Sequence, residues 1–230
     1  FDESPVTPGL LWAGTDDGYI WISRNNGVKW DNVTPPDIGD FTRVSIIEPS
    51  RYAAGTAYVA ANRYALGDKQ PILYKTTDYG RTWTKIVNGI KGDHFTRVIR
   101  EDPVRRGLLF TGTERGVYVS FDDGQNWQWL QKNLPFVPVH DLTIKDNDVI
   151  LATHGRSFWV LDDISALRQY QPAIAEKAAH LFKPVDAYRT QWSGGFGGGG
   201  GGGSVMGANP PSGAVVFYTL KAANQKVTMD

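Results

Sequence analysis

Short segments of alternating apolar and polar residues, separated by turn residues, make up most of this chain. Residues 10–15 and 19–23 are two such segments, and Asp16-Asp17-Gly18 between them has the composition of a tight turn. Segments of this length and spacing predict β-strands joined in antiparallel hairpins. We therefore expect an all-β fold over residues 1–163.

Two longer segments, residues 41–49 and 95–103, match each other almost position by position. Both begin with Phe-Thr-Arg-Val and end with a carboxylate followed by proline. This match predicts the same strand in two successive repeats. A fourth, less regular repeat is expected over residues 139–161, and Asp162-Asp163 follows it.

An eight-residue pattern, hydroxyl-x-Asp/Asn-x-Gly-x-x-Trp, occurs three times, at residues 23–30, 76–83 and 120–127. An Asp or Asn side chain accepts hydrogen bonds from backbone N–H groups two residues on, and glycine adopts the positive φ of a tight turn. The tryptophan begins the next strand and covers the turn. We expect a structural role for the residues that define the pattern: Asn25, Gly27, Trp30, Asp78, Gly80, Trp83, Asp122, Gly124 and Trp127.

This pattern is the Asp box, and the chain resembles the BNR/Asp-box β-propellers, which include sialidases, xyloglucan-active glycosidases and sortilin-type receptors. Residues 152–163, Ala-Thr-His-Gly-Arg-Ser-Phe-Trp-Val-Leu-Asp-Asp, are similar to a segment of secreted bacterial sortilin-like "glycosyl hydrolase" BNR-repeat proteins. The resemblance implies four-stranded blades around a central channel. The box tryptophans are spaced by 53 and 44 residues, which suits such blades.

The chain divides into four expected parts. Residues 1–163 are a partial propeller of three to four blades that begins inside a blade, and residues 164–192 are a helical and extended connector with helix over 172–181. Residues 193–208 are a glycine-rich linker, and residues 209–230 start a β-sandwich in which strand 213–220 pairs with residues 226–229. Both ends are expected to be cut from a longer polypeptide or a nicked assembly.

Composition excludes several classes of function. The 24 basic and 24 acidic residues cancel, so no overall field favours nucleic acid or an anionic membrane. There is no cysteine for a disulfide or a thiolate metal site, and the sequence has no apolar segment long enough for a membrane span. The four histidines lack the spacing of metal ligands, so we expect neither a metal nor a cofactor.

Candidate binding residues lie on one face of the expected propeller. The Asp boxes join the third and fourth strands of a blade, whereas the turns between the second and third strands lie on the opposite face. That opposite face also carries an elaborated loop, residues 62–71, which is either a specificity loop or a variable surface loop. The candidates for ligand binding are Arg43, Arg63, Tyr64, Arg97, Arg115, His140, His154 and Arg156.

The chemistry of these residues leaves alternatives open. Arginines that face a channel bind carboxylates or sugar acids bidentately, but Arg43 and Arg97 have the alternative of pairing with neighbouring acids such as Glu101. Glycoside hydrolysis needs two carboxyls across a cleft, and Asp16 or Asp17 with Glu114 are its candidates. The nucleophile pair of sialidases is not identifiable in this sequence.

Three functions are therefore considered. The first is a secreted, periplasmic or cell-surface recognition protein that binds a protein or peptide partner through its loop face. The second is a carbohydrate-active enzyme acting on a glycan, as the family resemblance implies. The third is a structural docking subunit of an envelope complex. In each case we expect the remaining blades to come from the same or another chain.

Overall fold

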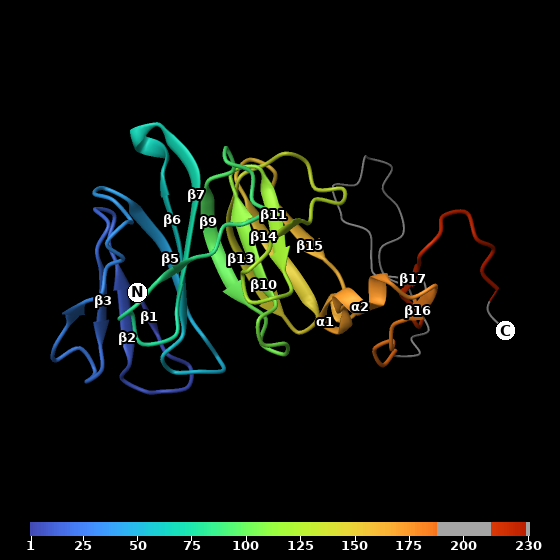
Figure 1. Cartoon of the computed structure of the whole chain (residues 1–230), viewed down its shortest axis with the longest axis horizontal. Helices are drawn as coiled ribbons and strands as arrows, with labels where there is room; N and C mark the ends of the chain where they lie inside the picture. The colour runs from blue at the N-terminus through green and yellow to red at the C-terminus, as the bar shows by residue number, and fades with distance from the viewer. Residues whose placement is uncertain (188–212, 229–230) are drawn as a thin grey trace, which may run out of the picture. The chain divides into compact units, whose positions relative to one another are not determined.

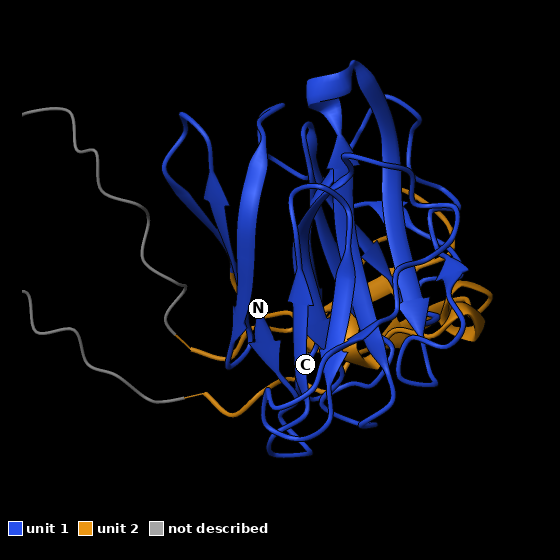
Figure 2. Cartoon of the chain, turned by 90° about the vertical axis from the view of Figure 1, so that its left-hand side faces the viewer, with its two compact units in different colours: residues 1–161 blue, residues 162–230 orange. Residues whose placement is uncertain are grey.

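The structure is a computed structural model that describes residues 1–187 and 213–228, and the chain forms two compact units, Phe1–Leu161 and Asp162–Asp230 (Figures 1 and 2). Unit 1 consists of four antiparallel sheets. Unit 2 contains two short helices and a two-stranded sheet among its described residues. Strands predominate, and the predicted all-β class is confirmed.

Each of the first three sheets has four strands in chain order, and the fourth has three. We call them blades 1 to 4. Blade 1 contains β1 (Asp2–Glu3), β2 (Leu11–Gly14), β3 (Ile20–Ser23) and β4 (Asp31–Asn32); blade 2 contains β5 (Arg43–Pro49), β6 (Ala57–Arg63), β7 (Asp68–Thr76) and β8 (Thr84–Lys85). Blade 3 contains β9 (Thr96–Glu101), β10 (Leu109–Thr113), β11 (Gly116–Ser120) and β12 (Gln128–Trp129); blade 4 contains β13 (Val139–Lys145), β14 (Asp148–Thr153) and β15 (Phe158–Leu161).

The first strands of the blades, β1, β5, β9 and β13, lie next to one another in this order and form the inner wall. Blade 1 has its own inner strand, because Asp2 and Glu3 pair with Trp12 and Leu11. This strand has two residues, whereas β5, β9 and β13 have seven, six and seven. Residues 62–71 also differ from the expected loop. The strands β6 and β7 extend into this region and a 3-10 turn, Tyr64–Leu66, caps them, so that they form a projecting hairpin (Figure 1).

Each Asp box forms the turn between the third and fourth strands of its blade. In the second box, Thr76 Oγ1 accepts the N–H of Gly80 at 2.9 Å, and Asp78 Oδ1 accepts the N–H of Thr82 at 2.9 Å. The backbone N–H that donates to the box carboxylate at this distance therefore lies four residues on, rather than the two that were expected. The residue before the box glycine also has positive φ in all three boxes: Asn26, Tyr79 and Asp123.

The box tryptophan reaches the preceding blade. The indole N–H of Trp83 donates to the carbonyl oxygen of Val33 at 2.6 Å, and that of Trp127 donates to Ile86 at 2.7 Å. Val33 and Ile86 directly follow the outer strands β4 and β8. The box glycine contacts the same residue, since a Cβ on Gly80 would stand 2.7 Å from the Cβ of Val33.

We call each of these contacts an inter-blade latch: Gly80 and Trp83 with Val33, and Gly124 and Trp127 with Ile86. Trp83 packs on the core between blades 1 and 2, and the buried Trp127 lies in the core between blades 2 and 3. The latch explains why both glycine and tryptophan recur in the box. Glycine is needed for its positive φ and for the close approach of the preceding blade.

Unit 2 differs from expectation in its short elements. Its helices are α1 (Ser165–Gln169) and α2 (Pro172–Ala175), and Pro172 occupies the first helical turn, where its missing N–H costs nothing. The expected helix over 172–181 ends early, because β16 (Ala179–Leu181) pairs with β17 (Tyr218–Leu220). β17 thus pairs with an earlier segment, and the described residues 226–228 form no strand. The glycine-rich stretch, residues 193–208, lies outside the described residues.

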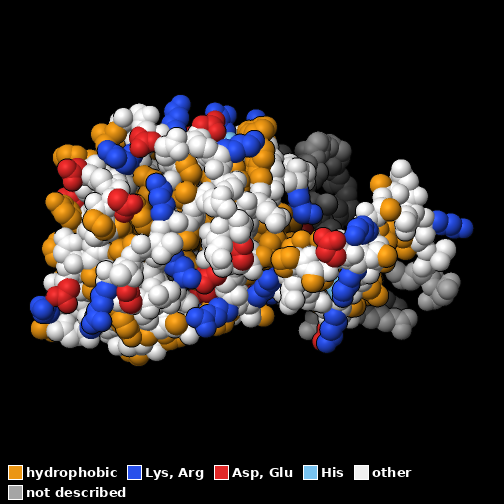
Figure 3. All heavy atoms as spheres, in the orientation of Figure 1, with side chains coloured by type: hydrophobic (Ala, Val, Ile, Leu, Met, Phe, Trp, Pro, Cys, Tyr) orange, Lys and Arg blue, Asp and Glu red, His pale blue; other side chains and the backbone are white. Residues whose placement is uncertain are grey.

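None of the helices in the described part of the chain is long and apolar enough to cross a membrane. Positive and negative side chains are interspersed over the visible face (Figure 3), as expected from the balance of charge in the sequence.

Candidate functional site

A polar depression lies where the inner strands of blades 2, 3 and 4 meet the second-to-third-strand hairpins. We call it the channel mouth. Its lining residues are Arg43, Ser45, Ile46, Asn62, Tyr64, Arg97, Glu114, His140, Asp141 and His154. The structure therefore brings together five of the predicted ligand-binding residues: Arg43, Tyr64, Arg97, His140 and His154.

Arg97 is fixed in the channel mouth by an ion pair and by aromatic rings. Its Nε and Nη2 both donate to Oε2 of Glu114, at 2.9 and 2.7 Å. Its guanidinium lies over the rings of Phe95 and Tyr64, which stack on each other with centroids 5.1 Å apart. The projecting hairpin thus supplies Tyr64 as a wall for Arg97. The positive charge of Arg97 is compensated by Glu114.

Arg97 thus pairs with a neighbouring acid, as the alternative expected, but the acid is Glu114 and not Glu101. The side chain of Glu101 is buried and accepts hydrogen bonds from Ser50 at 2.6 Å and from Tyr58 at 3.4 Å. Because its side chain points towards these two residues of blade 2, Glu101 holds blades 2 and 3 together and does not face the channel mouth.

Arg43 is exposed at the channel mouth, and no ion pair to it is found among the described residues. The rings of His140 and His154 stack beside it with centroids 5.1 Å apart. Burial lowers the pKa of His140, and the positive charge of Arg97 and the neighbouring His154 lower it further. The channel mouth thus presents one uncompensated arginine and two stacked imidazoles.

Three of the lining residues, Ser45, Arg97 and His140, are the extra residues of β-bulges. The register of β9 against β10 shifts between Thr96 and Val98. The register of β5 against β6 shifts between Val44 and Ile46, and that of β13 against β14 shifts between Val139 and Asp141. These three residues are therefore redirected into the channel mouth, which is a common use of bulges next to functional sites. Ser45 and Asp141 were not among the predicted binding residues, and Asn62 was included only as the first residue of the loop 62–71.

Asn62 lies at the floor of the channel mouth. Its Nδ2 donates to Ser45 Oγ at 2.9 Å, while its buried Oδ1 has no hydrogen-bond partner within the described residues. This amide oxygen is a buried acceptor without a donor in the described part of the chain.

The other predicted binding residues lie elsewhere. Arg115 lines a neighbouring depression, with its Nε 3.9 Å from Asp93. Arg63 lies against Gly39, where a Cβ would stand 2.7 Å from its Nη1. Arg156 is exposed in the turn between β14 and β15, and its carbonyl accepts the indole N–H of Trp159.

The three candidate catalytic carboxyls do not share one depression. Glu114 lines the channel mouth, whereas Asp17 lines a separate hollow with residues 34–36 and 38–40 and accepts a hydrogen bond from Thr15. Asp16 is exposed and lines neither. The pair proposed for glycoside hydrolysis is not assembled by these residues.

A second polar group lies on the inner wall and fastens three blades. Arg100 donates from Nη1 to Glu48 at 3.0 Å, from Nη2 to Asp141 at 3.0 Å and from Nε to the carbonyl of Leu142 at 3.1 Å. Burial raises the pKa of Glu48 despite the neighbouring guanidinium. These contacts join β5, β9 and β13, so we assign Arg100 a structural role.

No group of three or more potential metal ligands of the types His, Cys, Asp and Glu occurs in the described parts of the chain. His94, one of the four histidines, is buried and its Nδ1 lies 2.8 Å from the hydroxyl of Tyr118. It belongs to the core of blade 3 and not to the channel mouth.

Comparison with known proteins identifies the fold. No protein-family model and no curated protein matches the chain. Among solved structures, YCF48 from Cyanidioschyzon merolae matches with a TM-score of 0.51 and 18% identity, over 71% of this chain and 52% of that chain. The Niastella koreensis GH74 enzyme matches with a TM-score of 0.54 and 16% identity, over 70% of this chain and 27% of that chain.

The GH74 xyloglucanase from Xanthomonas campestris matches with a TM-score of 0.51 and 18% identity, over 66% of this chain and 25% of that chain. This chain thus spans about half the length of the YCF48 structure and about a quarter of the GH74 structures. These similarities show the fold, and the prediction of a partial β-propeller is confirmed.

Proposed function

We propose that this chain is a recognition part of a secreted or cell-envelope β-propeller, and that its channel mouth binds an acidic segment of a protein or peptide partner. The observation that carries the proposal is the exposed Arg43, which has no ion pair among the described residues. We also propose an extracytoplasmic location, because residues 152–163 resemble a segment of secreted sortilin-like proteins.

A carboxylate is the group that this surface fits best. The planar guanidinium of Arg43 presents parallel N–H donors, which match the two oxygens of a carboxylate. The nearby imidazoles of His140 and His154 add N–H donors. A neutral sugar would use only part of this donor set.

The arrangement favours binding over glycoside hydrolysis. Glu114 is engaged by Arg97, and neither Asp16 nor Asp17 lines the same depression. A hydrolase needs two carboxyls on opposite sides of one sugar-binding cleft. The similarity to GH74 enzymes concerns the fold, which hosts many functions.

The test is a binding measurement with two matched peptides. A fluorescein-labelled peptide of alternating Glu and Ala and its Gln-Ala counterpart are titrated with the full chain, and fluorescence anisotropy is recorded. We expect the acidic peptide to bind more tightly. Arg43→Gln should weaken its binding about tenfold or more, because a charge-assisted hydrogen bond is lost.

Arg106→Gln is the control variant, because Arg106 is also exposed but lies in the turn between β9 and β10, at the opposite end of the blade. It removes the same charge and should leave the affinity nearly unchanged. Equal loss in both variants would mean that net charge alone attracts the peptide. Equal affinity for the two peptides would overturn the proposal.

A further inference from the structure

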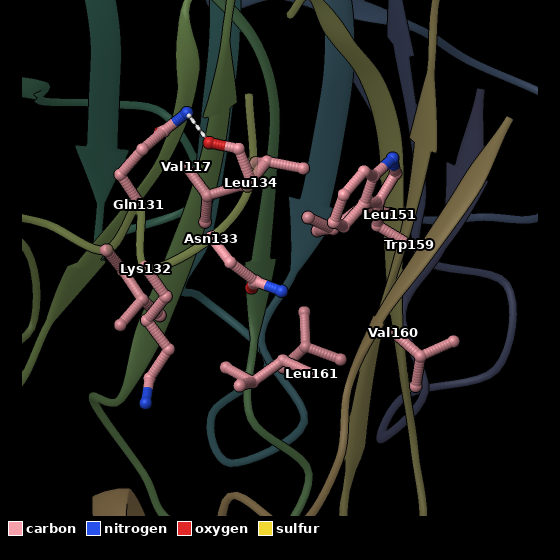
Figure 4. Close-up of a pocket in the computed structure, with 11 residues that line it drawn as sticks. Val117, Gln131, Lys132, Asn133, Leu134, Leu151, Trp159, Val160 and Leu161 are labelled. Carbon is pink, nitrogen blue, oxygen red and sulfur yellow. Dashed lines mark hydrogen bonds between the residues drawn. The ribbon is translucent and has the colours of Figure 1, made fainter. Parts of the chain in front are cut away.

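An apolar slot opens between the outer part of blade 3 and blade 4, and Figure 4 shows the side chains around it. It has a volume of about 420 Å³, which includes space open to solvent. Blade 3 contributes Val117 and residues 130–134, and blade 4 contributes Val149, Leu151 and residues 159–161. We call it the blade 3–4 slot.

The slot lies at the third of three equivalent interfaces between neighbouring blades. Val33 and Ile86 each follow the outer strand of their blade and are covered by the latch of the next blade. Leu130 follows the outer strand of blade 3, and its N–H donates to the third strand as theirs do. On the opposite wall, Trp159 has the register position that Tyr74 has in blade 2.

In the interface between blades 1 and 2, the box tryptophan fills the space that corresponds to the slot. Trp83 packs edge-on against Tyr74, with ring centroids 6.5 Å apart, and its indole N–H donates to Val33. Blade 4 has Asp162-Asp163 at the box but neither the glycine nor the tryptophan. The carbonyl of Leu130 receives no hydrogen bond from the described part of the chain.

The edge of β15 next to the slot has no partner strand among the described residues. Because Thr153 donates to Ser157, the alternation of an antiparallel ladder turns the N–H and C=O groups of Phe158 and Val160 away from β14. In blade 3 the position of Val160 is held by Val119, which pairs with the outer strand β12. An open strand edge of this kind is a template for another strand.

We propose that blade 4 is completed by an extended segment of a second polypeptide, which pairs with β15 and inserts a tryptophan into the blade 3–4 slot. The segment carries the Gly-x-x-Trp spacing of the boxes. Its indole N–H donates to the carbonyl of Leu130, and its backbone bonds to Phe158 and Val160. This is β-strand addition with one aromatic side chain as the specific contact.

The two latched interfaces define the occupant, because they show what fills an equivalent position on equivalent neighbours. The far face of the same strand supports a partner larger than one side chain: Phe158 and Val160 are 73% and 50% exposed. Exposed apolar residues on a strand edge are usually covered or replaced by charge. This surface is separate from the channel mouth, and the proposal does not depend on the proposed function.

The experiment uses a peptide with the sequence of residues 78–88, which contains the box glycine, the tryptophan and the outer strand of blade 2. The fluorescein-labelled peptide is titrated with the full chain, and anisotropy is measured. We expect saturable binding. A peptide with Trp83→Ala should bind at least tenfold more weakly, since the indole is the main buried group.

Variants of the chain test the strand edge. Val160→Pro removes the outward N–H, leaves the bonds to β14 intact, and should weaken binding at least tenfold. Val160→Thr retains the N–H and should bind as the unsubstituted chain does. Thermal unfolding of both variants shows whether the fold is retained, and the peptide series on the unsubstituted chain gives a decision even if Val160→Pro unfolds.

Three outcomes would overturn the proposal. The first is an absence of saturable binding, and the second is equal binding of the peptide with and without tryptophan. The third is binding that develops only in a Trp192→Ala variant, which would mean that this chain's own tryptophan takes the slot. A dimer of the chain that Val160→Pro abolishes would also overturn it, because the edge would then pair with a second copy of this chain and not with a different polypeptide.

Discussion

The interface between blades 2 and 3 and that between blades 3 and 4 are built on the same strand registers but are closed differently. In the first, Trp127 is buried and donates to Ile86, while Gly124 allows blade 2 to approach. In the second, Leu130 and Trp159 line an open apolar slot. The difference shows that the Asp box does more than close a hairpin, because it also fastens its blade to the preceding one.

The largest expected effect comes from removing a latch tryptophan. Trp127→Ala deletes a buried indole and a hydrogen bond, and should lower the free energy of unfolding by about 3–5 kcal/mol. Trp159→Ala removes the same type of side chain from the wall of the open slot, where it is only half-buried, and should cost about 1–2 kcal/mol. Urea denaturation followed by circular dichroism measures both. Equal losses would contradict the special role of the latch.

The second effect isolates the close approach of the blades. Gly80 and Gly155 have φ values of +79° and +88°, but only Gly80 has a neighbour, Val33, within reach of an added Cβ. Gly155→Ala should cost about 1–2 kcal/mol for its backbone conformation alone. Gly80→Ala should cost a further 1–3 kcal/mol, approximately, from overpacking. The comparison is made by thermal unfolding, and a Gly80 cost no larger than that of Gly155 would argue against the contact.

The smallest expected effect is a pH dependence of the free energy of unfolding that arises from His94, in the core between blades 2 and 3. Burial lowers the pKa of His94, which is 3% exposed and lies against Tyr118. The unfolded chain therefore binds this proton first, and stability falls as the pH drops below about 6.5. His94→Gln keeps a hydrogen-bonding side chain and should flatten the profile between pH 7.5 and 5. An unchanged profile would assign the effect to other groups.

The pH window separates this histidine from the Asp boxes. Hydrogen bonds from the backbone and side chain of Thr82 hold the pKa of Asp78 below its ordinary value. Stability that depends on this carboxylate is present above pH 3.8 and is lost as the pH falls through the lower pKa of the folded state. A profile limited to pH 5 and above therefore reports on the histidines.

Much of unit 1 was predictable because its sequence repeats. The match between residues 41–49 and 95–103 identified β5 and β9, and the boxes located the turns after the third strands. The target of the box tryptophan was not predictable, because Trp83 bonds to a residue 50 positions earlier in another sheet. Local turn chemistry carries no information on that partner.

The channel mouth was predictable in part for a similar reason. Arg43 and Arg97 both follow Phe-Thr in the repeated sequence, so a common direction was expected. Both side chains line the channel mouth, although Arg97 is a bulge residue that corresponds by register to Ser45. The bulges at Ser45 and His140 and the choice of Glu114 over Glu101 as partner for Arg97 depend on register, which a single sequence does not specify. In unit 2, pairing of β16 with β17 bridges a long sequence separation and left no local pattern.

The inter-blade latch also implies an order in which the blades become attached to one another during synthesis. The boxes of blades 2 and 3 each follow the first three strands of their blade and bind the residue after the outer strand of the blade before it. On a ribosome, the N-terminal blades emerge first, so each new blade closes onto a finished neighbour only when its own synthesis is nearly complete. When the tryptophan binds, one repeat is therefore completed and attached to the previous repeat in the same step.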